Sequence, residues 1–174
     1  MSATTPRRRL LLGIAAAALA ALLAAAPRPG RAEEPRRPLE LSTFPRTALE
    51  ITRHDAGQAP RKYQFQVWIA DTPERAEQGL MFVSDLPESM GMVFPVEPPR
   101  VETMWMKNTY IELDMLFIAA DGRVTKIIAN AAPMSLKTLS SDAPVAAVLE
   151  LKGGQAARLG VHVGDTVQWK KPAH

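Results

Sequence analysis

Apolar and polar residues alternate along several short stretches of this chain, which is the pattern of β-strands with one buried face. The clearest alternation covers residues 63–70, and a second covers residues 101–108. Residues 48–51 predict a short edge strand, and the ordered domain is expected to begin near them.

Other stretches are apolar almost without interruption. Residues 113–118 and 124–128 flank an Asp-Gly turn signal at 121–122, and this combination predicts a hairpin. Residues 145–151 suit a strand that is buried on both faces. The last predicted strand covers residues 166–169.

Two short helices are predicted among these strands. Residues 71–74, Asp-Thr-Pro-Glu, combine a capping side chain with Pro in the first turn, and Gly79 can end that helix. A second helical turn lies between the glycine pair at 153–154 and Gly160. The pattern therefore predicts a mainly β (β-rich α+β) domain, built as a compact antiparallel barrel-like or rolled sheet with two short helices.

The N-terminal region has the pattern of an export signal rather than of a folded element. Three arginines at positions 7–9 precede an uncharged apolar run over residues 10–26. Its 17 residues fall short of the about 20 that span a bilayer, so a cleaved signal is preferred to a membrane anchor. Cleavage is expected after Ala32, with Ala26 as the alternative, because Pro27 would directly follow the earlier site.

The predicted organisation is a signal peptide over residues 1–32, a Pro-rich linker over 33–47 and one domain over 48–174. A Sec-type signal is preferred, although the arginine run also fits a loose twin-arginine pattern. The expected location is periplasmic or secreted, with membrane contact only through the signal before cleavage.

Charge argues against one class of partner, and cysteine content limits how the fold can be stabilised. The net charge of +3 includes five signal-region arginines, and the rest of the chain has 16 basic against 18 acidic residues. No basic run with interleaved aromatics indicates nucleic acid. With no cysteine, a domain in an oxidising compartment must rely on its core rather than on disulfides.

Several short sequence blocks between Phe65 and Trp169 occur in a characteristic order. The chain resembles, through these blocks, a widespread bacterial and archaeal family known as domain of unknown function 192. The resemblance implies a small β-rich domain, often exported, and brings no established activity. The matching blocks are Gly79-Leu80-Met81, Gly91-Met92-Val93-Phe94, Trp105-Met106-Lys107-Asn108-Thr109, Leu113-Asp114 with Phe117, Val148-Leu149-Glu150, and Gly160 with Gly164-Asp165.

Polar residues interrupt two of the apolar strands. Asp114 and Glu150 lie in stretches that should be buried, where a carboxylate is costly unless it is paired or hydrogen-bonded. One hypothesis is that both converge with Lys107 on a partly dry site for a polar ligand or for acid/base chemistry. The alternative is a structural network, in which Asp114 and Asn108 hold backbone amides and Glu150 pairs with Lys107.

Methionine provides a separate candidate. Two Met-x-Met pairs, Met90 with Met92 and Met104 with Met106, each place two thioethers on one face of a strand. Soft thioethers suit Cu(I), although methionine is also a common filler of core gaps. Trp105 would point to the opposite face from its flanking methionines.

The leading functional expectation is non-catalytic binding of a small polar ligand or an envelope protein, with no cofactor. Soft-metal binding through the paired methionines and an enzyme using Asp114 or Glu150 stay as alternatives. No nucleophile triad and no phosphate-binding loop are readable. The candidate ligand-binding residues are Trp105, Lys107, Asn108, Thr109, Asp114 and Glu150.

Overall fold

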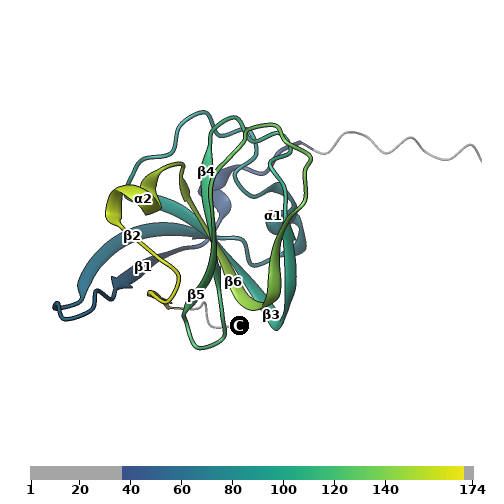
Figure 1. The fold of residues 1–174 in the computed structure, drawn as a ribbon. Coiled ribbons are helices and arrows are strands. Elements are labelled where there is room, and N and C mark those ends of the chain that lie inside the picture. The colour runs from purple at the N-terminus through teal and green to yellow at the C-terminus, as the bar shows by residue number, and fades with distance from the viewer. Residues whose placement is uncertain (1–36, 171–174) are drawn as a thin grey trace, which may run out of the picture. The chain divides into compact units, whose positions relative to one another are not determined.

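A computed structural model describes residues 37–170, which form a mainly β domain built on one strongly curled sheet (Figure 1). The seven strands run in the spatial order β5-β4-β6-β3-β2-β1-β7. All neighbouring strands are antiparallel except the parallel pair β2 and β3. The elements in chain order are η1 (Leu41–Thr43), β1 (Arg46–Arg53), β2 (Arg61–Ile69), α1 (Pro73–Gln78), β3 (Met90–Met104), β4 (Leu113–Ile118), β5 (Val124–Ala131), β6 (Leu139–Lys152), α2 (Gln155–Leu159) and β7 (Thr166–Trp169).

The curl brings the two outer strands of the sheet toward each other. A single bridge joins Arg123, just before β5, to Thr166 in β7. Next to it, the N–H of Val167 donates to the carbonyl of Gly122 over 2.8 Å. The sheet is therefore a half-barrel whose seam is fastened at one end, which confirms the predicted rolled β architecture.

Each face of the sheet packs against its own apolar cluster. One cluster contains Leu116 and Leu149 and is covered by α2 through Ala156. The other contains Met115 and Val148 and is covered by loop residues such as Leu86. Because successive strand residues point to opposite faces, β4 and residues 145–151 of β6 are buried on both sides, and these stretches are nearly continuous in apolar residues.

The two helices have the predicted ends. The Thr72 side chain accepts a hydrogen bond from the N–H of Arg75, Pro73 is the first helical residue, and Gly79 has a φ of 50° at the end of α1. Gly160 ends α2 in the left-handed conformation, which glycine adopts without steric cost. No described helix is long and apolar enough to cross a membrane.

Two strand predictions need correction. Residues 48–51 do not form an edge strand, because β1 lies between β2 and β7. The alternation over residues 101–108 belongs to a strand only as far as Met104, and residues 105–108 leave the sheet as a loop. The predicted signal peptide and residues 33–36 of the predicted linker lie outside the described residues, and the rest of that linker contains η1 and the first residues of β1.

Candidate functional site

Asp114 is fully buried, and its carboxylate is occupied by backbone amides. The side chain accepts hydrogen bonds from the N–H groups of Asn130, Gly154 and Ala156, at distances between 2.8 and 3.0 Å. Gly154 and Ala156 begin α2, so the carboxylate caps that helix and ties it to β4. This agrees with the structural alternative for Asp114 rather than with a ligand site.

Glu150 lies on the opposite face of the sheet from Asp114. Its register partners are Met92 on β3 and Met115 on β4, and residue 115 faces the second cluster whereas residue 114 does not. Burial raises the pKa of Glu150 to about 8, and its Oε2 atom has no hydrogen-bond partner. Asp114 and Glu150 therefore do not converge.

The four paired methionines belong to the core more than to a site. Met92 and Met106 are completely buried in the second cluster, and Met90 and Met104 pack against it at the two ends of β3. The two partly exposed thioethers thus lie a whole strand apart. Among the described residues, no group of three His, Asp or Glu side chains is arranged to hold a metal ion.

The loop after β3 carries the remaining predicted site residues. Trp105 is 44% exposed, and the Lys107 ammonium lies 5.2 Å from the centre of its ring. Lys107 is therefore beside an aromatic face and not beside Glu150. Asn108 has a φ of 54°, and Thr109 is buried with its hydroxyl donating to the Lys107 carbonyl.

Five large apolar side chains surround this loop and are exposed, and we call them the aromatic surface. They make up five of the eight exposed large apolar side chains in the described residues, so they are a concentration rather than a scatter. The rings of two members meet edge to face with 6.2 Å between their centres. The members are Phe82 (43% exposed), Trp105 (44%), Tyr110 (51%), Met134 (54%) and Leu136 (70%).

Three loops bring the aromatic surface together, and backbone hydrogen bonds join them near α1 (Figure 1). The N–H of Phe82 donates to the carbonyl of Asn108 over 2.9 Å, and the N–H of Met134 donates to the carbonyl of Thr109 over 3.0 Å. The N–H of Met106 donates to Ser135 in the same way. The loops therefore hold one another in a fixed arrangement.

The same loops contain unusual backbone conformations. Phe82, Asn108 and Met134 have φ values of 67°, 54° and 60°, although none is glycine. Such a conformation is uncommon for a residue with a Cβ, costs about 1–3 kcal/mol each, and concentrates at ligand-binding and switch sites. Of the five described non-glycine residues with a positive φ, these three lie in or directly beside the aromatic surface, which marks these loops as the strongest candidate functional site; the other two are Asn130 and Asp142.

The loops that carry the aromatic surface contain charges of both signs. Residues 79–89, 105–112 and 132–138 contain Lys107 and Lys137 together with Asp85, Glu88 and Glu112. Asp85 is ion-paired with Lys152, and Glu88 with Arg158. The ammonium group of Lys107, by contrast, lies over the ring of a member of the aromatic surface.

Sequence reasoning singled out Trp105 and, in the same loop, Lys107, Asn108 and Thr109, but not the other four members of the aromatic surface. Phe82, Tyr110, Met134 and Leu136 stand in irregular segments, where apolar side chains have no period to identify them. The signal that could have identified these four residues is their apolar character, since turns and loops are normally rich in polar residues.

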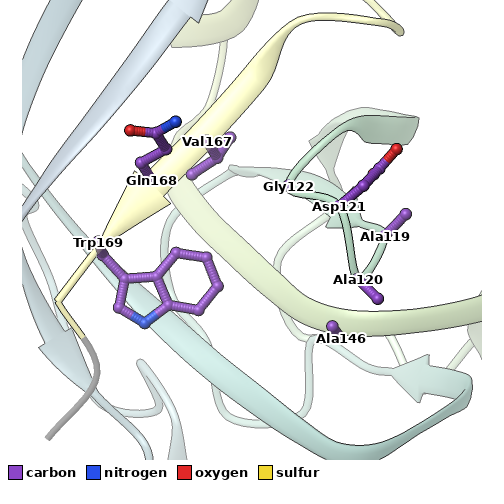
Figure 2. A pocket seen from close by; sticks show the side chains of 8 residues that line it. All are labelled: Ala119, Ala120, Asp121, Gly122, Ala146, Val167, Gln168 and Trp169. Carbon is purple, nitrogen blue, oxygen red and sulfur yellow. The ribbon is translucent and has the colours of Figure 1, made fainter.

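A second candidate is a pocket of about 390 Å³ on the seam of the half-barrel (Figure 2). Figure 2 shows the Trp169 indole extending from β7 toward Ala146, with Ala120 and the turn at Gly122 beyond it. Its only charged lining residue is Asp121, which is exposed and ion-paired with Arg123. None of the predicted site residues lines this pocket.

The domain belongs to the class of β half-barrels and has an exposed apolar surface on its loops. Comparison with known proteins gives its family. The model of the family DUF192, described as uncharacterized ACR, matches residues 54–169. The chain belongs to this family. No protein of curated function matches it.

Two solved structures are similar to the chain. One, from Sinorhizobium meliloti 1021, is described as a "putative transcription regulator"; it is 40% identical, with a TM-score of 0.68 over 72% of this chain and 95% of that one. The other, a protein of unknown function from Novosphingobium aromaticivorans DSM 12444, is 39% identical, with a TM-score of 0.65 over 70% of this chain and 84% of that one.

Proposed function

We propose that this protein is a non-catalytic binding module of the cell envelope that holds its partner through the aromatic surface. The observation that carries the proposal is the concentration of exposed large apolar side chains on three strained, mutually hydrogen-bonded loops. Exposed apolar areas of this kind mark interaction sites. Because the side chains are about half exposed, they suit an extended partner surface better than a small polar ligand.

The enzyme alternative has less support. Asp114 already accepts three backbone hydrogen bonds, so its carboxylate has little capacity left for a substrate. Glu150 has the raised pKa of a potential general acid, but its buried Oε2 atom lies among apolar side chains. A general acid must come within hydrogen-bond reach of its substrate.

The Sinorhizobium neighbour is described as a transcription regulator, but we do not propose that function for this chain. The two described α-helices have six and five residues, whereas proteins that read the major groove commonly do so with a longer recognition helix. The aromatic surface has two lysines, which supply few phosphate contacts. These observations favour a partner other than nucleic acid.

Residence in the envelope rests on the N-terminal sequence. Arginines, a 17-residue apolar run and small-x-small sites follow one another in the order of a cleaved signal peptide. The cysteine-free composition suits a compartment in which thiols oxidise. In this proposal the domain works periplasmically or outside the cell.

The test is photo-crosslinking in cells that express the full chain. A photoreactive p-benzoylphenylalanine replaces Trp105 in one variant and the exposed Val163 in a matched control. Val163 lies in the turn before β7, at the opposite end of β5 from Met134. We expect adducts to lipid or protein from position 105 and none from position 163; equal labelling, or none from either, contradicts the proposal.

A further inference from the structure

We propose that the partner of the aromatic surface is an anionic phospholipid bilayer, on which the folded domain docks without spanning it. This inference rests on the proposed function and names the partner that the site fits. It differs from the expectation that only the signal segment contacts a membrane. Three properties of the surface carry it: the types of its apolar side chains, its basic residues and its rigidity.

The apolar side chains are those that favour the membrane interface. Trp105 and Tyr110 carry a polar atom on an aromatic body, and such residues gather at headgroup level. Phe82, Met134 and Leu136 add apolar area, with Leu136 exposed over 70% of its surface. Apolar groups on the face of a peripheral protein enter a bilayer to a depth of about 5–10 Å, which single side chains can reach.

The type of basic residue favours a lipid surface over a protein one. Protein interfaces are enriched in arginine and depleted in lysine, whereas lysines beside apolar membrane contacts extend their ammonium groups to the headgroups. The three loops contain Lys107 and Lys137 and no arginine. Two of their three carboxylates, those of Asp85 and Glu88, are ion-paired with Lys152 and Arg158. Lys107 already lies over the Trp105 ring, so a charge and an interfacial aromatic are placed together.

The backbone of the surface is organised before any partner arrives. Hydrogen bonds at Phe82, Met106 and Met134 connect the three loops. Docking therefore does not have to order the backbone of these loops, a cost that weakens binding by flexible segments.

The first experiment measures sedimentation with vesicles. The probes are vesicles of phosphatidylcholine alone and of phosphatidylcholine mixed with phosphatidylglycerol, and the protein is the exported chain recovered from its host. We expect binding to the mixed vesicles that falls with added salt. The Trp105→Ala variant should bind about ten-fold more weakly, and Lys107→Gln about five-fold more weakly.

The matched control is Val163→Ala, an exposed apolar residue outside the surface. All variants share one N-terminus, so any contribution of that segment cancels between them. Circular dichroism and thermal unfolding confirm that each variant folds. The control should bind as the parent protein does, and equal binding by all variants overturns the inference.

A second readout follows Trp105 directly. Mixed vesicles should shift tryptophan emission to shorter wavelength. The shift should disappear in Trp105→Phe, because Trp68 and Trp169 lie outside the aromatic surface. A shift that persists in Trp105→Phe contradicts insertion of this ring.

The two proposals fail in distinguishable ways. If vesicles do not bind while a photoreactive group at position 105 attaches to a protein, the bilayer inference falls and the binding function stands. If neither vesicles nor crosslinks report a partner, both fall.

Discussion

Asp114 connects three segments of the chain through one carboxylate. Its hydrogen bonds reach Asn130 at the end of β5 and the first amides of α2. Each of these amides, if left buried without an acceptor, costs about 1–3 kcal/mol. The residue is therefore a structural joint, and its replacement should act on stability.

We predict that Asp114→Ala lowers the free energy of unfolding by at least about 3 kcal/mol, because several buried amides lose their acceptor together. Urea unfolding followed by circular dichroism measures this. Asp85→Ala is the control, since Asp85 makes an exposed ion pair with Lys152 and should change stability by less than about 0.5 kcal/mol. Similar losses of stability in the two variants would contradict a structural role for Asp114.

Glu150 has the opposite character, because burial removes its carboxylate from water and its Oε2 atom has no hydrogen-bond partner. Its pKa rises from 4.5 in the unfolded chain to about 8 in the folded one. The contribution of Glu150 to stability is therefore complete below the pKa of the unfolded chain and is lost as pH rises toward the pKa of the folded one. Over that range the unfolded state releases a proton that the folded state keeps.

We predict that stability falls by a few kcal/mol between about pH 4.5 and 8 on account of Glu150. Glu150→Gln should abolish this part of the pH dependence and be more stable than the parent at pH 8. Urea unfolding of both proteins across that range is the measurement. Identical slopes for parent and variant would show that Glu150 is not responsible.

At the scale of elements, β3 is the strand on which the domain is organised. It is 15 residues long, pairs in parallel with β2 and antiparallel with β6, and ends where the aromatic surface begins. Gly91 in β3 lies directly against β6, opposite Leu151. A Cβ at this position would stand 2.5 Å from the carbonyl oxygen of Glu150 and 2.9 Å from a methyl carbon of Leu151.

We predict that Gly91→Ala destabilises the domain by about 2–3 kcal/mol, because backbone cannot move aside as a flexible side chain does. Gly57→Ala is the comparison, since Gly57 has open space but a φ of 74°. It should cost only about 1 kcal/mol of conformational strain. Thermal unfolding ranks the two, and a milder effect at Gly91 would contradict the close approach.

Local patterns predicted most elements, and they failed where the outcome depended on distant pairing. The hairpin around residues 121–122 and both helices depend on neighbouring residues, so the sequence was sufficient for them. Whether Asp114 and Glu150 share a face depends on the register of β4 against β6, which no local period reveals. The aromatic surface likewise depends on three loops that meet only in the folded chain.

At the scale of the whole molecule, the chain combines a folded domain with an N-terminal sequence of a different kind. If the export proposal is right, the protein recovered from the envelope begins at Glu33, after cleavage behind Ala32. Intact-mass spectrometry measures this directly, with the Arg8→Ala and Arg9→Ala double variant testing a twin-arginine route. Recovery of the full-length mass from the envelope would contradict cleavage.

The pairing of β1 with β7 has a consequence for how the protein acquires its structure. Leu49 pairs with Trp169, so almost the whole domain separates two strands that lie side by side. Because such distant contacts form slowly, and because β7 follows the other strands of the sheet along the chain, the half-barrel stays incomplete until β7 has left the ribosome. If the export proposal is right, that interval is when a translocation machinery that accepts only unfolded chains can engage the protein.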